Sequence, residues 1–280
     1  MRVFEFRDNT AAGSRGGGSR EPAPIELTIL ETGTLRTKLK YIKMNQGEQD
    51  YEIPVSWFVV EHPWGNVVID GGAAVEAAID PRGYLGAAVD ANQPAMTVAD
   101  NCVDRALSVG VAPDDVQFVL QSHLHLDRTG AIGRFPKAKT IVQRSEYDYA
   151  HNPDWFSKAA YISRDIDRPD VDWMFLDGEY TDSYDLFGDG AVRMIFSPER
   201  RSVLLRLPNA GPVLLPIDAA YTVDHWEDTA LPGIVCSSVD AVRSVVKLRA
   251  IAPSTGATVV TGHDPSKWAK FRHAPMGFYH

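Results

Sequence analysis

The order of apolar and polar residues along the chain predicts a protein rich in β-strands, beginning at Ile25. Some stretches alternate between apolar and polar residues, as half-buried strands do, and others are short apolar runs typical of buried strands. The predicted strands cover residues 25–30, 35–42, 55–61, 66–70, 116–121, 140–142, 193–196, 202–207, 213–217 and 258–260. A turn separates the first two strands, and residues 62–65 join the third and fourth into a hairpin.

Two stretches have the spacing and end signals of helices, at residues 98–109 and 237–252. The first follows Thr97, a predicted N-cap with Asp100 three residues on, and Gly110 stands at its C-terminal end. Strands dominate the first third of the chain and alternate with helices afterwards. This pattern predicts sheets packed in the middle of the molecule with helices outside them.

The domain organisation follows from where apolar residues are sparse. Residues 1–24 predict a flexible N-terminal arm, and no Pro- or Ser-rich linker interrupts residues 25–280, so we expect one domain there. No long apolar run predicts a membrane span or a secretory signal. The two cysteines, Cys102 and Cys236, make no disulfide framework, so we expect a cytoplasmic protein.

The charge balance narrows the choice of partners. The chain has 28 Lys and Arg against 37 Asp and Glu, a formal net charge of −9. A nucleic-acid surface needs a basic stripe, so we expect no nucleic-acid partner and no membrane partner. We expect a small-molecule ligand, and the sequence does not separate a monomer from a homodimer.

The strongest chemical signal directly follows the predicted strand at residues 116–121. His123, His125 and Asp127 stand at alternate positions of the next loop. Alternate side chains of an extended chain project to one side, so these donors are expected to converge at one end of the sheet. Imidazole and carboxylate groups suit zinc and other first-row divalent ions. By spacing alone, two incidental histidines on a polar loop remain the alternative.

These residues and three later blocks resemble the metallo-β-lactamase superfamily, and within it the N-acyl-homoserine lactonases and related lactonases such as 4-pyridoxolactonase. The blocks are residues 122–127, 135–136 with 145–147, 217–222 and 261–264. The resemblance implies an αββα sandwich, with two central mixed β-sheets flanked by helices. It also implies a metal-dependent hydrolase that opens a lactone or similar cyclic ester by attack of metal-bound hydroxide.

The resemblance assigns metal ligands position by position. His123 and His125 match ligands of a first metal ion, and Asp127 and His263 match ligands of a second. Asp218 matches the carboxylate that bridges the two ions.

The resemblance also implies roles in catalysis and substrate binding. Tyr221 matches a phenol that hydrogen-bonds the substrate carbonyl, and Asp127 or the bridging carboxylate passes a proton to the leaving alkoxide. Asp70 matches an aspartate that supports the ligand loops, a simple turn carboxylate being the alternative. Trp155 and Phe156 lie where relatives carry a substrate-binding insertion, so we expect them to contact the substrate.

Two departures from the family pattern affect the expected metal site. Arg128 stands where the family motif has a further histidine, and a guanidinium cannot coordinate a cation. A family block containing Pro-Gly-His is replaced by residues 196–203, which contain no histidine. Glu199 could partly replace that lost ligand, a solvated turn carboxylate being the alternative.

Each ion would keep three protein donors, so the departures favour one Zn²⁺ over two, because two close dications beside Arg128 repel. Two functions stay open: a metal-dependent lactonase, and a catalytically impaired or repurposed protein that binds a small ligand. In a third possibility, Arg128 binds an anionic group of the substrate where the second ion would sit.

Overall fold

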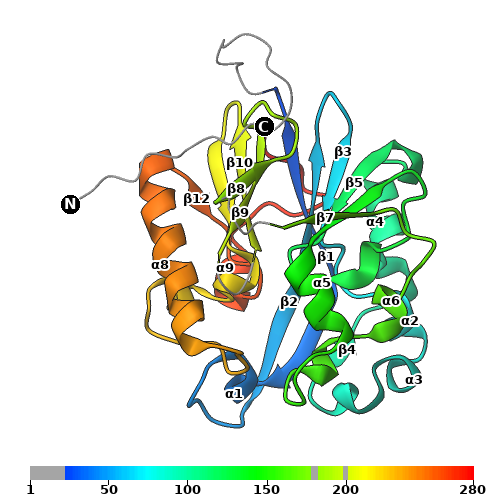
Figure 1. Ribbon diagram of the computed structural model, residues 1–280, viewed down its shortest axis with the longest axis vertical. Helices are drawn as coiled ribbons and strands as arrows, with labels where there is room; N and C mark the ends of the chain where they lie inside the picture. Colours follow the sequence, from blue (N-terminus) through cyan, green and yellow to red (C-terminus); the bar gives the residue numbers. More distant parts are fainter. Residues whose placement is uncertain (1–22, 178–181, 198–200) are drawn as a thin grey trace.

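Two β-sheets packed face to face form the centre of the molecule, and helices cover their outer sides (Figure 1). The computed structural model describes residues 23–177, 182–197 and 201–280. Each sheet contains both parallel and antiparallel pairs. The expected αββα sandwich of two mixed sheets is therefore confirmed.

The larger sheet turns from antiparallel to parallel pairing along its width. Its strands lie in the order β4 (Gln93–Ala95), β1 (Glu26–Lys38), β2 (Asp50–Glu61), β3 (Asn66–Ile69), β5 (Val116–Leu120), β6 (Lys139–Gln143) and β7 (Trp173–Leu176). The pairs from β3 to β7 are parallel, so the carboxyl ends of these strands meet at one edge. The loop that carries His123 leaves β5 at this edge.

The smaller sheet brings two distant chain segments to a common edge. Its strands lie in the order β12 (Thr258–Val259), β11 (Gly211–Leu215), β10 (Arg201–Leu207), β9 (Val192–Phe196) and β8 (Ser183–Asp185). Only the pair of β11 and β12 is parallel among these described strands. The segments that follow them, with Asp218 and His263, therefore leave the sheet together.

Helices cover the outer face of each sheet (Figure 1). The longest, α8 (Ser238–Thr255), packs Leu248 and Ile251 against the smaller sheet. The others are α1 (Leu39–Ile42), α2 (Glu76–Ile79), α3 (Pro81–Leu85), α4 (Cys102–Ser108), α5 (Arg144–His151), α6 (Ser163–Ile166), α7 (Val223–Trp226) and α9 (Pro265–Trp268). Single 3-10 turns lie at Gly86–Asp90, Val98–Asp100, Pro113–Asp115, Thr129–Ala131, Lys158–Ala160 and Ile217–Ala219. Among the described residues, no helix combines the length and the apolar character that a membrane span requires.

The main hydrophobic core lies between the two sheets. Phe58 and Leu120 of the larger sheet and Met194 and Leu205 of the smaller are fully buried in one cluster. Burial of apolar surface contributes about 25 cal/mol per Å², so this layer holds the sheets together. It thereby fixes the two loop edges relative to each other.

The predicted hairpin of residues 55–61 and 66–70 is confirmed as β2 and β3, but the preceding pair is wrong. β1 runs without reversal from Glu26 to Lys38, and its pairing with β2 shifts register between Glu31 and Thr34. Gly33, at a φ of +86°, absorbs the irregularity as a local bulge. The turn signal there marks a bulge in one long strand.

The predicted helix at residues 98–109 is divided in two. Thr97 and Asp100 cap each other as expected, but they close only a 3-10 turn. The Asn101 side chain then accepts hydrogen bonds from two backbone N–H groups and starts α4 as a new cap. The predicted arm, residues 1–24, lies outside the described residues except for Ala23 and Pro24, and the single domain over residues 25–280 stays a prediction.

Candidate metal centre

The predicted donor residues come together where the loop edges of the two sheets meet. His123 follows β5 in the larger sheet, whereas Asp218 and His263 follow β11 and β12 in the smaller. Nε2 of His123 lies 3.1 Å from Oδ2 of Asp218, and Nε2 of His263 lies 3.4 Å from Oδ1 of the same carboxylate. Asp218 therefore stands between two histidines.

His123, His125 and Asp218 form a compact set of donors, with one atom from each within 4.8 Å of the others. A relay fixes the first imidazole: Ser122 Oγ donates to Asp70 Oδ2 at 3.0 Å and lies 3.0 Å from His123 Nδ1. Because this hydroxyl donates to Asp70, it accepts from Nδ1–H. Nε2 of His123 then keeps its lone pair.

The surroundings of this Nε2 atom test whether a metal ion fits the site. It is buried, has no hydrogen-bond partner among the described residues, and faces an Asp218 oxygen 3.1 Å away. Two lone pairs at this distance, away from water, repel unless a cation lies between them. Two imidazoles and one carboxylate with an open fourth position are also a ligand number typical of catalytic zinc. The residues therefore fit one divalent ion.

The loop that carries His123 and His125 packs closely against the turn after β3, which supports it. Asp70 has a φ of +67° and accepts a hydrogen bond from the backbone N–H of Ser122 at 2.8 Å. Gly130 lies so near that a Cβ atom on it would meet the carbonyl oxygens of Gly71 and Ala73 at 2.6 and 2.7 Å. Only glycine permits this approach without a shift of the backbone.

Arg128 fills the position predicted for a second ion. Its side chain is 0% exposed. Nη2 donates to Asp218 Oδ1 at 2.6 Å and contacts Nε2 of His263. Nε lies 3.3 Å from Asp127 Oδ2, and Nη1 donates to the Ser56 carbonyl at 2.9 Å. The three residues expected to hold the second ion are thus arranged around a guanidinium.

A second ion does not fit these residues. Bonds from zinc to oxygen or nitrogen are about 2.0–2.2 Å long, so an ion bound to both Asp218 and His263 would overlap Nη2 of Arg128. Charge opposes it as well, since a dication about 4 Å from a guanidinium is repelled by about 8 kcal/mol at an effective dielectric constant of 20. The guanidinium therefore occupies the space that an ion bound by Asp218 and His263 would need.

The guanidinium also sets the protonation of the carboxylates. Burial favours the neutral form of Asp218, but Arg128 outweighs it and holds the pKa of Asp218 well below its ordinary value. The same balance, in which Arg128 opposes burial, lowers the pKa of Asp127. Both groups are therefore carboxylates at neutral pH.

The comparison with known sequences decides the family. The profile of the Metallo-beta-lactamase superfamily matches residues 50–263. The chain belongs to the metallo-beta-lactamase superfamily. It is 55% identical over 256 residues to the N-acyl homoserine lactonase AttM of Rhizobium radiobacter, covering 90% of this chain and 97% of that protein.

Two solved structures share the metallo-beta-lactamase fold with this chain. One is an N-acyl homoserine lactone hydrolase with the product N-hexanoyl-L-homoserine bound at its catalytic metal centre. It matches with a TM-score of 0.81 at 24% identity, covering 92% of this chain and 99% of that one. The other is AidC, a dizinc quorum-quenching lactonase, with a TM-score of 0.65 at 15% identity and coverage of 93% and 95%. At these identities the likeness supports the fold alone.

The residues predicted to contact the substrate lie at different distances from the candidate metal centre. Tyr221 is buried, and its ring centroid lies 5.6 Å from that of His263. Trp155 and Phe156 are 88% and 41% exposed and contact each other edge-on, so the structure places them on the surface of the loop after α5. The predicted substrate contact of Arg128 does not fit a side chain that is buried against protein acceptors.

Sequence reasoning missed several residues that hold the ligands in place. The Tyr161 ring packs edge-on against His125 at 5.0 Å, and Glu146 accepts a hydrogen bond from the backbone of Leu124 at 2.9 Å. Glu146 belongs to one of the family blocks, which was its signal. Ser56, which accepts from Arg128, lies inside β2 and has no such signal. The expected substitute ligand Glu199 lies outside the described residues.

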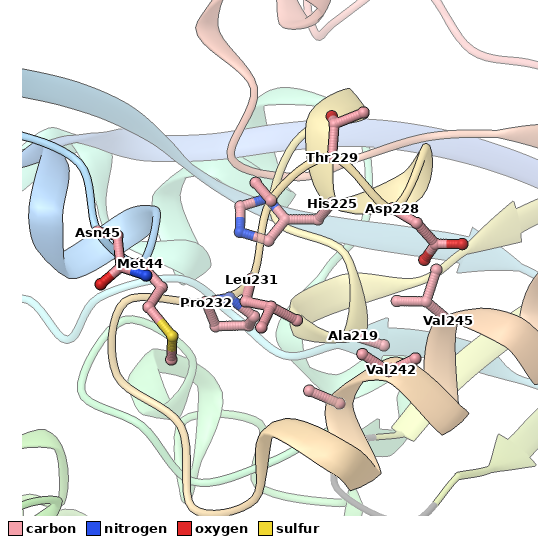
Figure 2. Close-up of a pocket in the computed structure, with 12 residues that line it drawn as sticks. Met44, Asn45, Ala219, His225, Asp228, Thr229, Leu231, Pro232, Val242 and Val245 are labelled. Carbon is pink, nitrogen blue, oxygen red and sulfur yellow. The ribbon is translucent and has the colours of Figure 1, made fainter.

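A hollow of about 520 Å³ lies beside the segment that follows β11 (Figure 2). His225, Leu231 and Pro232 line one part of it, and Val242 and Val245 of α8 line another. None of His123, His125 and Asp218 is among the lining residues. Ala219, the residue directly after Asp218, does line it.

Proposed function

We propose that this protein is a metal-dependent hydrolase that opens the lactone ring of N-acyl homoserine lactones. The observation that carries the proposal is the likeness to the lactonase AttM over almost the whole length of both chains. The donor set of His123, His125 and Asp218 supports it, because these residues fit the ion that such chemistry needs. Zn²⁺ is the ion we propose.

A divalent ion held by His123, His125 and Asp218 supplies polarisation of the lactone carbonyl and a water molecule of lowered pKa. The protein contributes the rigidity of this site. The hydrogen bonds that join Asp70, Ser122 and His123 fix the first imidazole in the tautomer whose Nε2 is basic.

Two further residues act on the substrate in this proposal. The Tyr221 phenol donates a hydrogen bond to the carbonyl oxygen as it gains negative charge. The ionised Asp127 accepts a proton from the attacking water and delivers it to the alkoxide released when the ring C–O bond breaks. The Asp127 side chain is 10% exposed.

Binding of a small ligand without hydrolysis is the second candidate function. One observation favours it: Arg128 replaces a histidine of the family motif and fills the second metal position. Lewis-acid chemistry at that position is therefore not available to this chain.

An assay of ring opening separates the two functions. Zinc-loaded protein is incubated with N-hexanoyl-homoserine lactone, and the ring-opened acid is quantified by chromatography. We expect hydrolysis that stops on chelation, returns with zinc, and is lost in His125→Ala but kept in the exposed control His151→Ala. Zinc-loaded, folded protein that is no faster than His125→Ala would overturn the lactonase proposal. Saturable lactone binding without product would then support the second function.

A further inference from the structure

We propose that Arg128 permanently replaces a second metal ion, so that the protein binds one divalent ion per chain and uses the guanidinium as the fixed cation beside it. The ion count stands independently of the proposed function. Only the consequence for catalysis rests on lactone hydrolysis.

The first argument is how the two oxygens of Asp218 are used. Oδ1 accepts a hydrogen bond of 2.6 Å from Nη2 of Arg128, and Oδ2 faces the bare Nε2 of His123 at 3.1 Å. The carboxylate thus spans two cationic positions. One of them is the predicted ion site of His123 and His125, and the other is already part of the chain.

The second argument is that two predicted ligands of the second ion, His263 and Asp127, already contact Arg128. Nδ1 of His263 lies 2.7 Å from the Pro54 carbonyl, which can only accept, so Nδ1 carries the proton. The lone pair of Nε2 is then directed at Nη2 of Arg128. Asp127 pairs with Nε of the same guanidinium at 3.3 Å.

The third argument is the charge of the site. Arg128 already places a buried positive charge 2.6 Å from Asp218 and 3.3 Å from Asp127. A dication at the second position would lie against this guanidinium, and the two positive charges would repel each other. Because AidC shares the fold and is a dizinc lactonase, the fold itself accommodates two ions. The restriction to one comes from Arg128 of this chain.

The guanidinium cannot take over all that an ion does. It holds its protons at any physiological pH, so it neither coordinates a carbonyl oxygen nor activates water. Its side chain is fully buried, so it acts as a positioning residue. It holds Asp218 with one oxygen towards the ion and fixes the Asp127 carboxylate at its side.

The test is the number of zinc ions bound, measured without substrate. Protein stripped with a chelator is titrated with Zn²⁺ by calorimetry, and metal content after dialysis is measured by mass spectrometry. We expect one tight equivalent in the unmodified protein and in Arg128→Lys, which keeps the positive charge. We expect two in Arg128→His, because the imidazole restores a donor and frees Asp127 and His263. Arg134→His, which changes an arginine paired with Glu76 away from the centre, is the control and should stay at one.

Two tight equivalents in the unmodified protein would overturn the proposal, as would a single equivalent in folded Arg128→His. If Arg128→His does not fold, Asp127→Asn decides. We expect it to keep one equivalent, because Asp127 is not a ligand of the bound ion, and loss of zinc binding would refute us. A chain that binds one ion but fails to open lactones would contradict only the proposed function. A lactonase that binds two ions would contradict only this inference.

Discussion

Replacing Ser122 by alanine tests whether the relay behind His123 prepares the metal site. The hydroxyl oxygen lies 3.0 Å from both Asp70 Oδ2 and His123 Nδ1. Its removal leaves a buried ring N–H without an acceptor, which costs about 1–3 kcal/mol. Loss of such an outer partner weakens metal binding by about 10- to 100-fold, equivalent to about 1.4–2.8 kcal/mol. The two estimates agree, so we expect the zinc Kd of Ser122→Ala to rise by that factor.

The assay is competitive zinc titration of chelator-stripped protein with a metal-sensitive dye. Ser108→Ala is the matched control, because Ser108 is exposed at the end of α4 and its hydroxyl donates to the Arg105 carbonyl. Thermal unfolding of the metal-free proteins checks that both variants fold. If the zinc Kd of Ser122→Ala stays within twofold of that of the unmodified protein, the relay does not orient His123 and our argument for its tautomer is wrong.

Three further predictions follow from other parts of the structure. Burial lowers the pKa of His225 to about 4 from an ordinary 6.5, so the folded protein binds fewer protons than the unfolded chain between these values. The free energy of unfolding should therefore fall by up to about 3 kcal/mol as the pH drops through that range. Urea unfolding of His225→Gln should lack this pH-dependent loss, and an identical pH trend in both proteins would contradict the prediction. Gly130→Ala should lower the free energy of unfolding by more than about 2 kcal/mol, because its Cβ meets backbone oxygens. Gly110→Ala has open space around its Cβ but a φ of +88°, and it should lower the free energy of unfolding by about 1 kcal/mol. Equal shifts in thermal unfolding would refute the packing argument. Tyr221→Phe should lower kcat for the lactone by about 10- to 100-fold with zinc content unchanged, and an unaltered kcat would remove the phenol from the mechanism.

The sequence located the candidate donor residues because each follows an apolar run in a recognisable block. His123, Asp218 and His263 come shortly after β5, β11 and β12. Parallel pairing brings the ends of β11 and β12 together, and the packing of the two sheets brings the end of β5 beside them. The sequence also showed that Arg128 cannot be a ligand. It could not show where the guanidinium goes, because its partner Ser56 lies inside a strand more than seventy residues earlier.

Local sequence signals gave wrong elements where the same residues are compatible with two different local structures. A Gly33 turn and a Gly33 bulge have the same sequence signature, and only pairing with β2 along its length selects the bulge. Asn101 is compatible with a helix interior, yet its side chain caps a new helix when the backbone extends before it. Trp155 and Phe156 were assigned from their place in the family pattern, which does not specify whether a loop folds inward.

The contact between Arg128 and Asp218 has a consequence for the life of the protein in a cell. It joins the two sheets, since one residue follows β5 and the other β11. A metal ion in this role would stabilise the fold by RT ln(1 + [L]/Kd), and that contribution disappears when free zinc is scarce. A guanidinium is part of the chain and cannot dissociate from it. The fraction of folded, protease-resistant protein therefore depends little on the metal supply. We expect zinc starvation to abolish the activity of this protein well before it lowers the amount of folded protein.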